Sequence, residues 1–259
     1  MNFAKETRCT DGRCEISSGS LEAQRFCSLA DEISLLCQSL GREKNSCQIL
    51  PVTKTIAPEV LVGLCKNKIL TFGENKVQEL KSKYSHLANF APTWHFIGHL
   101  QTNKVRECVE RVNLIHSLDR LDLAIKLDSE LQKLGRSMDV LIQVNTSGEP
   151  SKFGVKPEAT KELVKNIKDL QSLKIKGLMT LAIFSSEENR VRKCFRNLRE
   201  LSESIKAEGY YGVEMNELSM GMSSDYKIAI EEGATIVRLG QTIFGPRKTP
   251  DSFYWDENK

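Results

Sequence analysis

The stretch DVLIQVNT, residues 139–146, is an almost unbroken run of apolar side chains that ends in the polar pair Asn145 and Thr146. A strand that is buried on both faces has this composition, and such strands are typical of parallel sheets. The next apolar run, LKIKGLMTLA at 173–182, follows a helix-like stretch at 156–170. The three segments together predict one strand–helix–strand unit.

The same alternation extends along most of the chain. Apolar runs occur at 47–54, 69–75, 93–99, 113–119, 139–146, 173–182, 215–221 and 235–240, with helix-like stretches at 57–66, 75–88, 102–110, 120–134, 156–170, 186–208 and 223–233. Successive runs end about 27 residues apart, the size of one strand–helix unit. A leading helix is predicted at 21–40. Eight units predict a single (β/α)8 TIM-like barrel, and an open doubly wound sheet is the alternative.

Length and composition fit one globular α/β domain. The chain has 259 residues, and a barrel of this type takes about 250. Charged residues make up 27% and the net charge is +3, which excludes a disordered chain and disfavours nucleic acid as the main partner. No apolar stretch is long enough to cross a membrane. We expect a loose N-terminal extension over 1–20 and the barrel over 21–259.

The N-terminal segment and the cysteines indicate a cytoplasmic protein. Residues 1–20 contain no apolar core of a secretory signal. None of the eight cysteines forms a C-x-x-C pair, so zinc ligation is disfavoured and reduced, buried thiols are expected.

Lys54 ends the first apolar run, and the carboxyl ends of barrel strands form the active-site face. A lysine pointing into the barrel would be partly desolvated, which lowers its pKa and makes the amine a nucleophile toward carbonyls. The alternative is a lysine that caps the strand in solvent.

Two Gly- and Ser-bearing turns follow the last two apolar runs. They are ELSMGMSSD at 217–225 and VRLGQTIFG at 237–245. Barrels commonly bind phosphate at this position, and the candidate donors are Ser219, Gly221, Ser223, Gly240 and Gln241. Arg238 lies inside the last run and needs an acceptor if it is buried, either a ligand or a structural ion-pair partner.

Three histidines occur near the third and fourth apolar runs. If His95 and His99 lie on one strand, their Cα atoms are roughly 13 Å apart, too far for one metal ion. With His116 they therefore do not predict a metal site.

A reactive lysine, a phosphate cradle and a buried arginine together fit pyridoxal 5′-phosphate (PLP), which carries an aldehyde, a phosphate and a ring nitrogen. At these positions the chain resembles the pyridoxal phosphate homeostasis proteins, the YggS/PROSC family. The matching segments are LPVTKT (50–55), FGENKVQE (72–79), WHFIGHLQTNKV (94–105), HSLDR (116–120), LIQVNTSGEPSKFGV (141–155), GLMTLA (177–182), ELSMGMSSDYKIAIEEGAT (217–235) and VRLGQTIFGPR (237–247).

The resemblance implies a barrel similar to the N-terminal domain of alanine racemase, with PLP held as a Schiff base on Lys54. It places Asn75 by the ring and Arg238 near the ring nitrogen. It places Ser219, Ser223, Gly240 and Gln241 near the phosphate. Two positions depart from the family pattern: Ile56 stands where a second lysine is frequent, and Gln241 stands where Thr or Ser is usual.

The resemblance also implies a protein that binds and buffers PLP, with no established catalysis and so no catalytic residue. An arginine beside the ring nitrogen disfavours ring protonation and weakens the ring as an electron sink. The chain shows no second domain and no tyrosine at a strand end, both of which a racemase of the alanine racemase type uses. Such a racemase is the enzyme alternative, and a sugar-phosphate aldolase using Lys54 is another.

PLP-dependent apoenzymes are the expected partners, and no membrane or nucleic-acid partner is expected. A monomer is expected because no apolar stripe demands a dimer. Lys152, in the SKFG segment, is predicted to face solvent.

Overall fold

The computed structural model describes residues 20–246. The predicted extension at 1–20 therefore lies outside the described residues except for Ser20, and its boundary stays a prediction.

Eight parallel strands form one sheet, and each lies within or overlaps one predicted run. They are β1 (Gln48–Pro51), β2 (Thr71–Glu74), β3 (Thr93–Phe96), β4 (Leu114–Leu118), β5 (Met138–Gln143), β6 (Leu173–Met179), β7 (Val213–Ser219) and β8 (Ile236–Leu239). Their spatial order is β1-β8-β7-β6-β5-β4-β3-β2. Because β1 also bridges to β2 through Val52 and Gly73, the sheet curls into a nearly closed barrel. The predicted barrel is confirmed, and the open doubly wound sheet is wrong.

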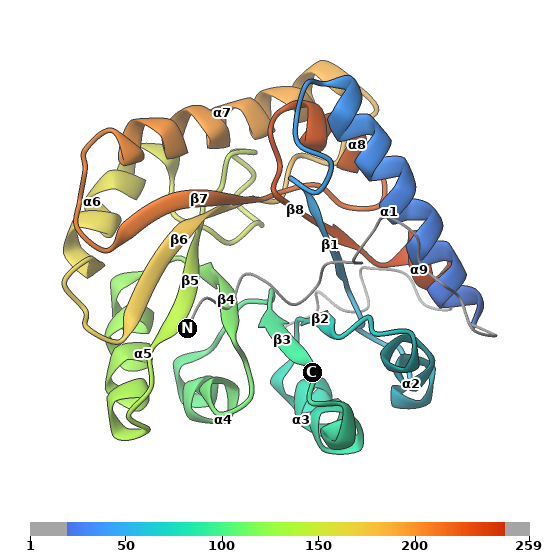
Figure 1. Ribbon diagram of the computed structural model, residues 1–259. Coiled ribbons are helices and arrows are strands. Elements are labelled where there is room, and N and C mark those ends of the chain that lie inside the picture. The colour runs from blue at the N-terminus through green and yellow to red at the C-terminus, as the bar shows by residue number, and fades with distance from the viewer. Residues whose placement is uncertain (1–19, 247–259) are drawn as a thin grey trace.

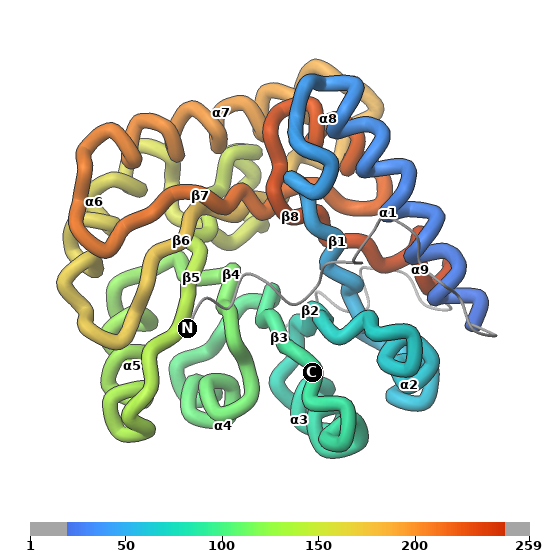
Figure 2. The backbone as a smooth tube through the Cα atoms, in the orientation of Figure 1, coloured from blue at the N-terminus to red at the C-terminus, as the bar shows by residue number. Residues whose placement is uncertain are grey.

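The helices form a ring around the strands, as Figure 1 shows. They are α1 (Leu21–Ser39), α2 (Pro58–Lys66), α3 (Val77–His86), α4 (Val105–Val109), α5 (Leu121–Lys133), α6 (Pro157–Ile167), α7 (Glu188–Lys206), α8 (Tyr226–Glu231) and α9 (Gln241–Phe244), with 3-10 turns η2 (Ala88–Phe90) and η3 (Thr102–Lys104). Figure 2 follows the backbone through these units. The last helices, α8 and α9, return to lie beside the first helix, α1. The predicted helix at 102–110 is divided between η3 and α4.

Pro51 explains why the β1–β2 seam is short. The N–H groups of Gln48 and Val52 donate to the β8 side of β1, and that of Thr53 donates to Gly73 of β2. Because alternate residues of a parallel strand bond to opposite neighbours, the nitrogen of Pro51 faces β2 and has no hydrogen to donate. The seam is therefore closed by the isolated Val52–Gly73 bridge, to which the Thr53 N–H contributes a hydrogen bond, at the end of β1 next to Lys54.

The described cysteines are reduced and buried, as predicted: Cys27, Cys37, Cys47, Cys65, Cys108 and Cys194. Cys9 and Cys14 lie outside the described residues. Between residues 20 and 246, no helix has the length and apolarity to cross a membrane.

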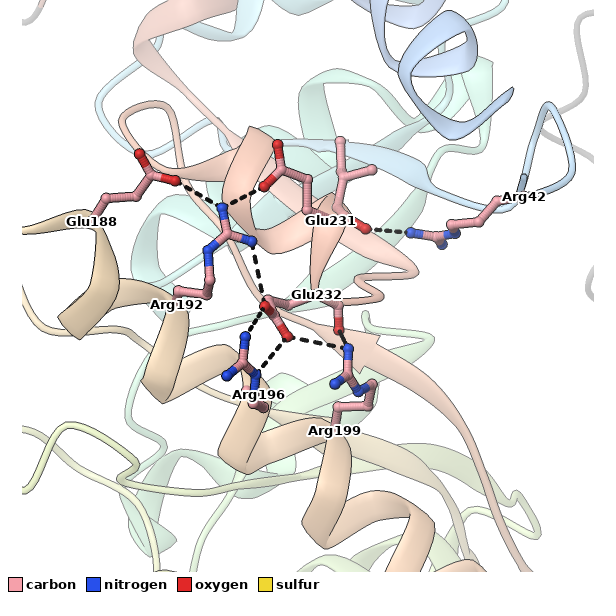
Figure 3. A network of polar contacts seen from close by, with 8 residues as sticks. Arg42, Glu188, Arg192, Arg196, Arg199, Glu231 and Glu232 are labelled. Atoms are coloured by element: carbon pink, nitrogen blue, oxygen red, sulfur yellow. Dashed lines mark hydrogen bonds and ion pairs between the residues drawn. The ribbon is translucent and has the colours of Figure 1, made fainter. Parts of the chain in front are cut away.

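Three arginines of α7 converge on the carboxylate of Glu232, just after α8 (Figure 3). Arg192, Arg196 and Arg199 lie 3.3, 3.0 and 3.1 Å from its oxygens, and the Glu232 side chain is only 5% exposed. Arg42, which follows α1, donates to the carbonyl oxygen of Ile230 in α8 at 2.7 Å. These contacts anchor α8, the helix that follows the turn after β7, to the outer ring.

Replacing Glu232 with glutamine should destabilise the barrel because it would leave this arginine cluster without its central negative charge. We expect Glu232→Gln to lower the free energy of unfolding by about 2 kcal/mol, measured by urea denaturation. Glu231→Gln is the control, since this more exposed carboxylate contacts Arg192 alone and is expected to contribute less than about 1 kcal/mol. Equal losses in the two variants would contradict the assigned role of Glu232.

Candidate functional site

The predicted site residues lie at the carboxyl ends of four neighbouring strands. The strand order places β7, β8, β1 and β2 side by side around the barrel. Lys54 follows β1, Asn75 follows β2, Ser219 ends β7, Ser223 follows β7, Arg238 lies in β8, and Gly240 and Gln241 follow β8. The topology therefore brings the predicted set together on one side of the barrel mouth.

Lys54 lies in a turn with an unusual backbone. Thr53 is fully buried, Lys54 is half-buried and Thr55 is exposed. Thr55 has φ 69°, a conformation that a β-branched residue adopts at a cost of about 1–3 kcal/mol. Its N–H donates to Oε2 of Glu79 at 2.7 Å, and this bond holds the strained residue in place.

A buried charge network lies beside this turn. The ammonium of Lys83, from α3, donates to the carbonyl oxygen of Thr53 at 2.6 Å and to the carboxylates of Glu74 and Glu79. The Thr53 hydroxyl donates to Glu74 at 2.6 Å. Burial raises the pKa of Glu74, and the Lys83 ammonium opposes that rise. Lys83 was not among the predicted site residues, because the spacing of residues on a helix does not indicate which lysine turns inward.

Arg238 is buried, as predicted, and its partners are neutral groups rather than an ion-pair partner. It donates to the Ser219 hydroxyl and to the Thr180 carbonyl oxygen, both at 2.8 Å. The Ser219 hydroxyl also lies 2.9 Å from Nδ1 of His116, and Nε2 of His116 lies 3.1 Å from Nδ1 of His95. A continuous hydrogen-bonded chain thus crosses the barrel from β8 to β3.

Arg238 fixes the first bond of this chain. A guanidinium only donates, so the Ser219 oxygen accepts from it. The directions of the Ser219–His116 and His116–His95 bonds are set by the tautomers of the two imidazole rings. Burial lowers the pKa of His95 to about 4. Burial, followed by the charges of His95 and Arg238, holds the pKa of His116 well below its ordinary value, so both rings are neutral at neutral pH.

The turns that follow β7 and β8 approach each other. The hydroxyl of half-buried Ser223 lies 3.4 Å from that of Thr242 in α9. Gly240 is buried and Gln241 is exposed at the start of α9. Thr242 was not among the predicted residues. It places a hydroxyl beside Ser223, one residue after the position where the family usually has Thr or Ser.

Asn75 has an unsatisfied polar atom. Its Oδ1 is buried and has no hydrogen-bond partner among residues 20–246. Gly98 allows the chain to pass closely here, since a Cβ at that position would lie 2.1 Å from the Asn75 carbonyl oxygen. A buried amide end without a partner is costly, and a polar atom of a ligand would satisfy it. In this respect the site fits a polar cofactor.

Lys152 does not face solvent, and that prediction is wrong. Its ammonium donates to the carbonyl oxygen of Ala182 at 2.7 Å and pairs with Glu149, which leaves the side chain 21% exposed. The loop after β5 folds back over the end of β6, a contact that spacing along the chain does not reveal.

The histidines do not share one strand. β3 ends at Phe96, so His99 lies beyond it, with its ring stacked on Phe153 at 3.8 Å. His95 and His116 bond to each other across neighbouring strands. Residues 20–246 contain no group of three His, Cys, Asp or Glu side chains placed to hold a metal ion.

Comparison with known proteins places the chain in one family. Residues 28–248 match the family model described as the alanine racemase N-terminal domain. The pyridoxal phosphate homeostasis protein of Aquifex aeolicus (strain VF5) is 44% identical over 87% of this chain and 98% of its own. The protein of that name from Vibrio alginolyticus is 40% identical over 81% of this chain and 91% of its own.

Solved structures agree with this fold. PipY of Synechococcus elongatus PCC7942, solved with PLP bound, superposes with a TM-score of 0.73 at 32% identity, over 82% of this chain and all of its own. Alanine racemase of Clostridium difficile 630 superposes with a TM-score of 0.65 at 16% identity, over 86% of this chain and 57% of its own. The second match is evidence for the fold alone. Together, the barrel, the family-model match and these relatives show that the chain belongs to the pyridoxal phosphate homeostasis protein family, within the alanine racemase N-terminal fold.

Proposed function

We propose that this protein holds PLP as a Schiff base on Lys54 and serves intracellular PLP homeostasis by buffering and supplying the cofactor. One observation carries the proposal: the half-buried Lys54, the buried Arg238 and the Ser223–Thr242 hydroxyl pair occupy the ends of adjacent strands. When bound, PLP supplies an aldehyde for an amine, a ring that accepts electrons and a phosphate. The relative PipY, solved with PLP bound, supports this choice of ligand.

Each part of the site has a distinct task in the proposal. Lys54 supplies the amine, and Asn75 offers its unsatisfied amide end beside the ring. Ser223, Thr242, Gly240 and Gln241 surround the phosphate. Ser219 has a different main task from the one expected, since its hydroxyl already bonds Arg238 and His116 and thereby orients the guanidinium.

Arg238 makes carbanion chemistry on the ring harder without excluding a racemase, which would also need a second base. Burial lowers the pKa of Arg238 to about 10, which leaves it charged at neutral pH. A fixed positive charge disfavours protonation of an adjacent ring nitrogen and so keeps the ring a weak electron sink. His116 and His95, which continue the hydrogen-bonded chain from Arg238, are neutral and do not supply a proton to the ring.

The described tyrosines do not supply the base that a racemase needs. Tyr226 donates to Glu32 of α1 at 2.9 Å, on the outer ring. Tyr84 belongs to α3, and Tyr210 and Tyr211 precede β7 at the opposite end of that strand. Tyr254 lies outside the described residues. We therefore propose a non-catalytic carrier, acting as a cytoplasmic monomer that supplies PLP-dependent apoenzymes. The reduced state of the described cysteines supports that compartment.

Removal of the Lys54 amine tests the proposal directly. Purified protein incubated with PLP should be yellow, and Lys54→Ala should lose the visible absorbance because the amine proposed to form the Schiff base is removed. Lys152→Ala is the control and should keep the colour, since Lys152 is engaged by Ala182 and Glu149. A colourless wild type that does not bind added PLP would end the proposal and favour the sugar-phosphate aldolase alternative.

The phosphate assignment is tested by comparing PLP with pyridoxal, which lacks the phosphate. Ser223→Ala and Thr242→Ala should each weaken PLP binding about tenfold, because a hydrogen bond to a charged group is lost. Neither change should affect pyridoxal binding. Ser224→Ala removes an exposed neighbouring hydroxyl and should leave both affinities unchanged. Equal weakening of PLP and pyridoxal by Ser223→Ala would show that the hydroxyl is not at the phosphate.

Carrier and racemase are separated by deuterium exchange at the α-carbon of alanine and related amino acids. The carrier predicts no exchange above that of free PLP in the same buffer, measured by NMR. Exchange at enzymatic rates, lost in Lys54→Ala, would favour the racemase alternative.

A further inference from the structure

In the buried network beside the Lys54 turn, the Lys83 ammonium uses all of its hydrogen-bond donors. An ammonium has three hydrogens, and that of Lys83 meets the Thr53 carbonyl oxygen, Glu74 and Glu79. Its side chain is 4% exposed. Lys83 is therefore fully engaged and is not a second amine for an aldehyde, although it lies close to the site.

The network holds the Lys54 turn from both sides. Lys83 bonds the carbonyl oxygen of Thr53, the residue before Lys54. Glu79 accepts the N–H of Thr55, the residue after it. The ion pair between Lys83 and Glu79 joins these two contacts at 3.0 Å. The residues on both sides of Lys54 are therefore tethered to α3.

The same network extends to Asn75. Glu74 accepts the Thr53 hydroxyl and, through its other oxygen, the backbone N–H of Asn75 at 3.3 Å. Thr53, the residue before Lys54, and Asn75 are thus both bonded to one buried carboxylate, across the seam where Pro51 leaves few backbone bonds.

Stability alone does not account for this arrangement. Buried ion pairs are costly to desolvate, and apolar replacements of similar volume are frequently at least as stable. The strained left-handed Thr55 also persists only while something holds it. We propose that Lys83, together with Glu74 and Glu79, is a positioning device that fixes the angle at which Lys54 leaves the turn. This inference rests on the proposed PLP site.

The test uses variants that keep the buried charge balanced. Glu74→Gln/Lys83→Met removes a carboxylate and an ammonium together, so that neither remains buried alone. We expect this variant to fold by far-UV circular dichroism, to bind PLP at least about tenfold more weakly and to lose much of the visible circular dichroism of the bound cofactor. Lys81→Met is the matched control on the exposed side of α3 and should behave as wild type.

Glu79 provides a second test, and one readout needs no cofactor. Hydrogen exchange of the Thr55 amide in PLP-free protein should accelerate at least about tenfold in Glu79→Ala. Glu79→Gln, which keeps an acceptor oxygen, should retain most of the protection and most of the PLP affinity. If Glu74→Gln/Lys83→Met does not fold, Glu79→Ala alone still tests the positioning role.

The outcomes separate the two proposals. Folded Glu74→Gln/Lys83→Met or Glu79→Ala with wild-type PLP affinity and visible circular dichroism would overturn the positioning role, as would unchanged Thr55 exchange in Glu79→Ala. Failure of the wild type to bind PLP would instead refute the proposed function, whatever the exchange of Thr55 shows.

Discussion

The narrow seam between β1 and β2 is the constraint on which the candidate site depends. A parallel barrel brings all strand ends to one mouth, but only if its first and last neighbours close the ring. Here Pro51 withholds one backbone bond, and closure rests on the Val52–Gly73 bridge, which includes the bond from the Thr53 N–H. The buried contacts among Thr53, Glu74 and Lys83 span the same seam. Lys54 is the next residue after Val52 and Thr53, which make the closing contacts. Closure of the barrel and placement of the lysine are therefore coupled.

The opposite wall of the site is built around the buried Arg238. Its guanidinium donates to Ser219, and a hydrogen-bonded chain continues from Ser219 through His116 to His95. Both imidazoles are held neutral by burial, and the chain therefore orients the arginine without offering a proton. Such an environment suits a protein that retains a cofactor in an unreactive state, which is the role that we propose.

The sequence predicted the architecture well because its evidence is local. Nearly continuous apolar runs and their regular spacing identified all eight strands. Charged residues at the end of one run and inside another made Lys54 and Arg238 the predicted site residues. Contacts between distant segments were harder to predict. The inward turn of Lys83, the pairing of His95 with His116, the hydroxyl of Thr242 beside Ser223 and the return of Lys152 to Ala182 all depend on strand register and loop path. The spacing of residues along the sequence specifies neither the strand register nor the path of a loop.

Location of the cofactor linkage is the most direct test of the central claim. PLP-incubated protein is treated with borohydride, which reduces a Schiff base to a stable secondary amine, and is then digested and analysed by tandem mass spectrometry. The account predicts one dominant pyridoxyl-phosphate adduct, on the side chain of Lys54. A dominant adduct on another lysine, or the absence of any adduct at saturating PLP, would contradict it.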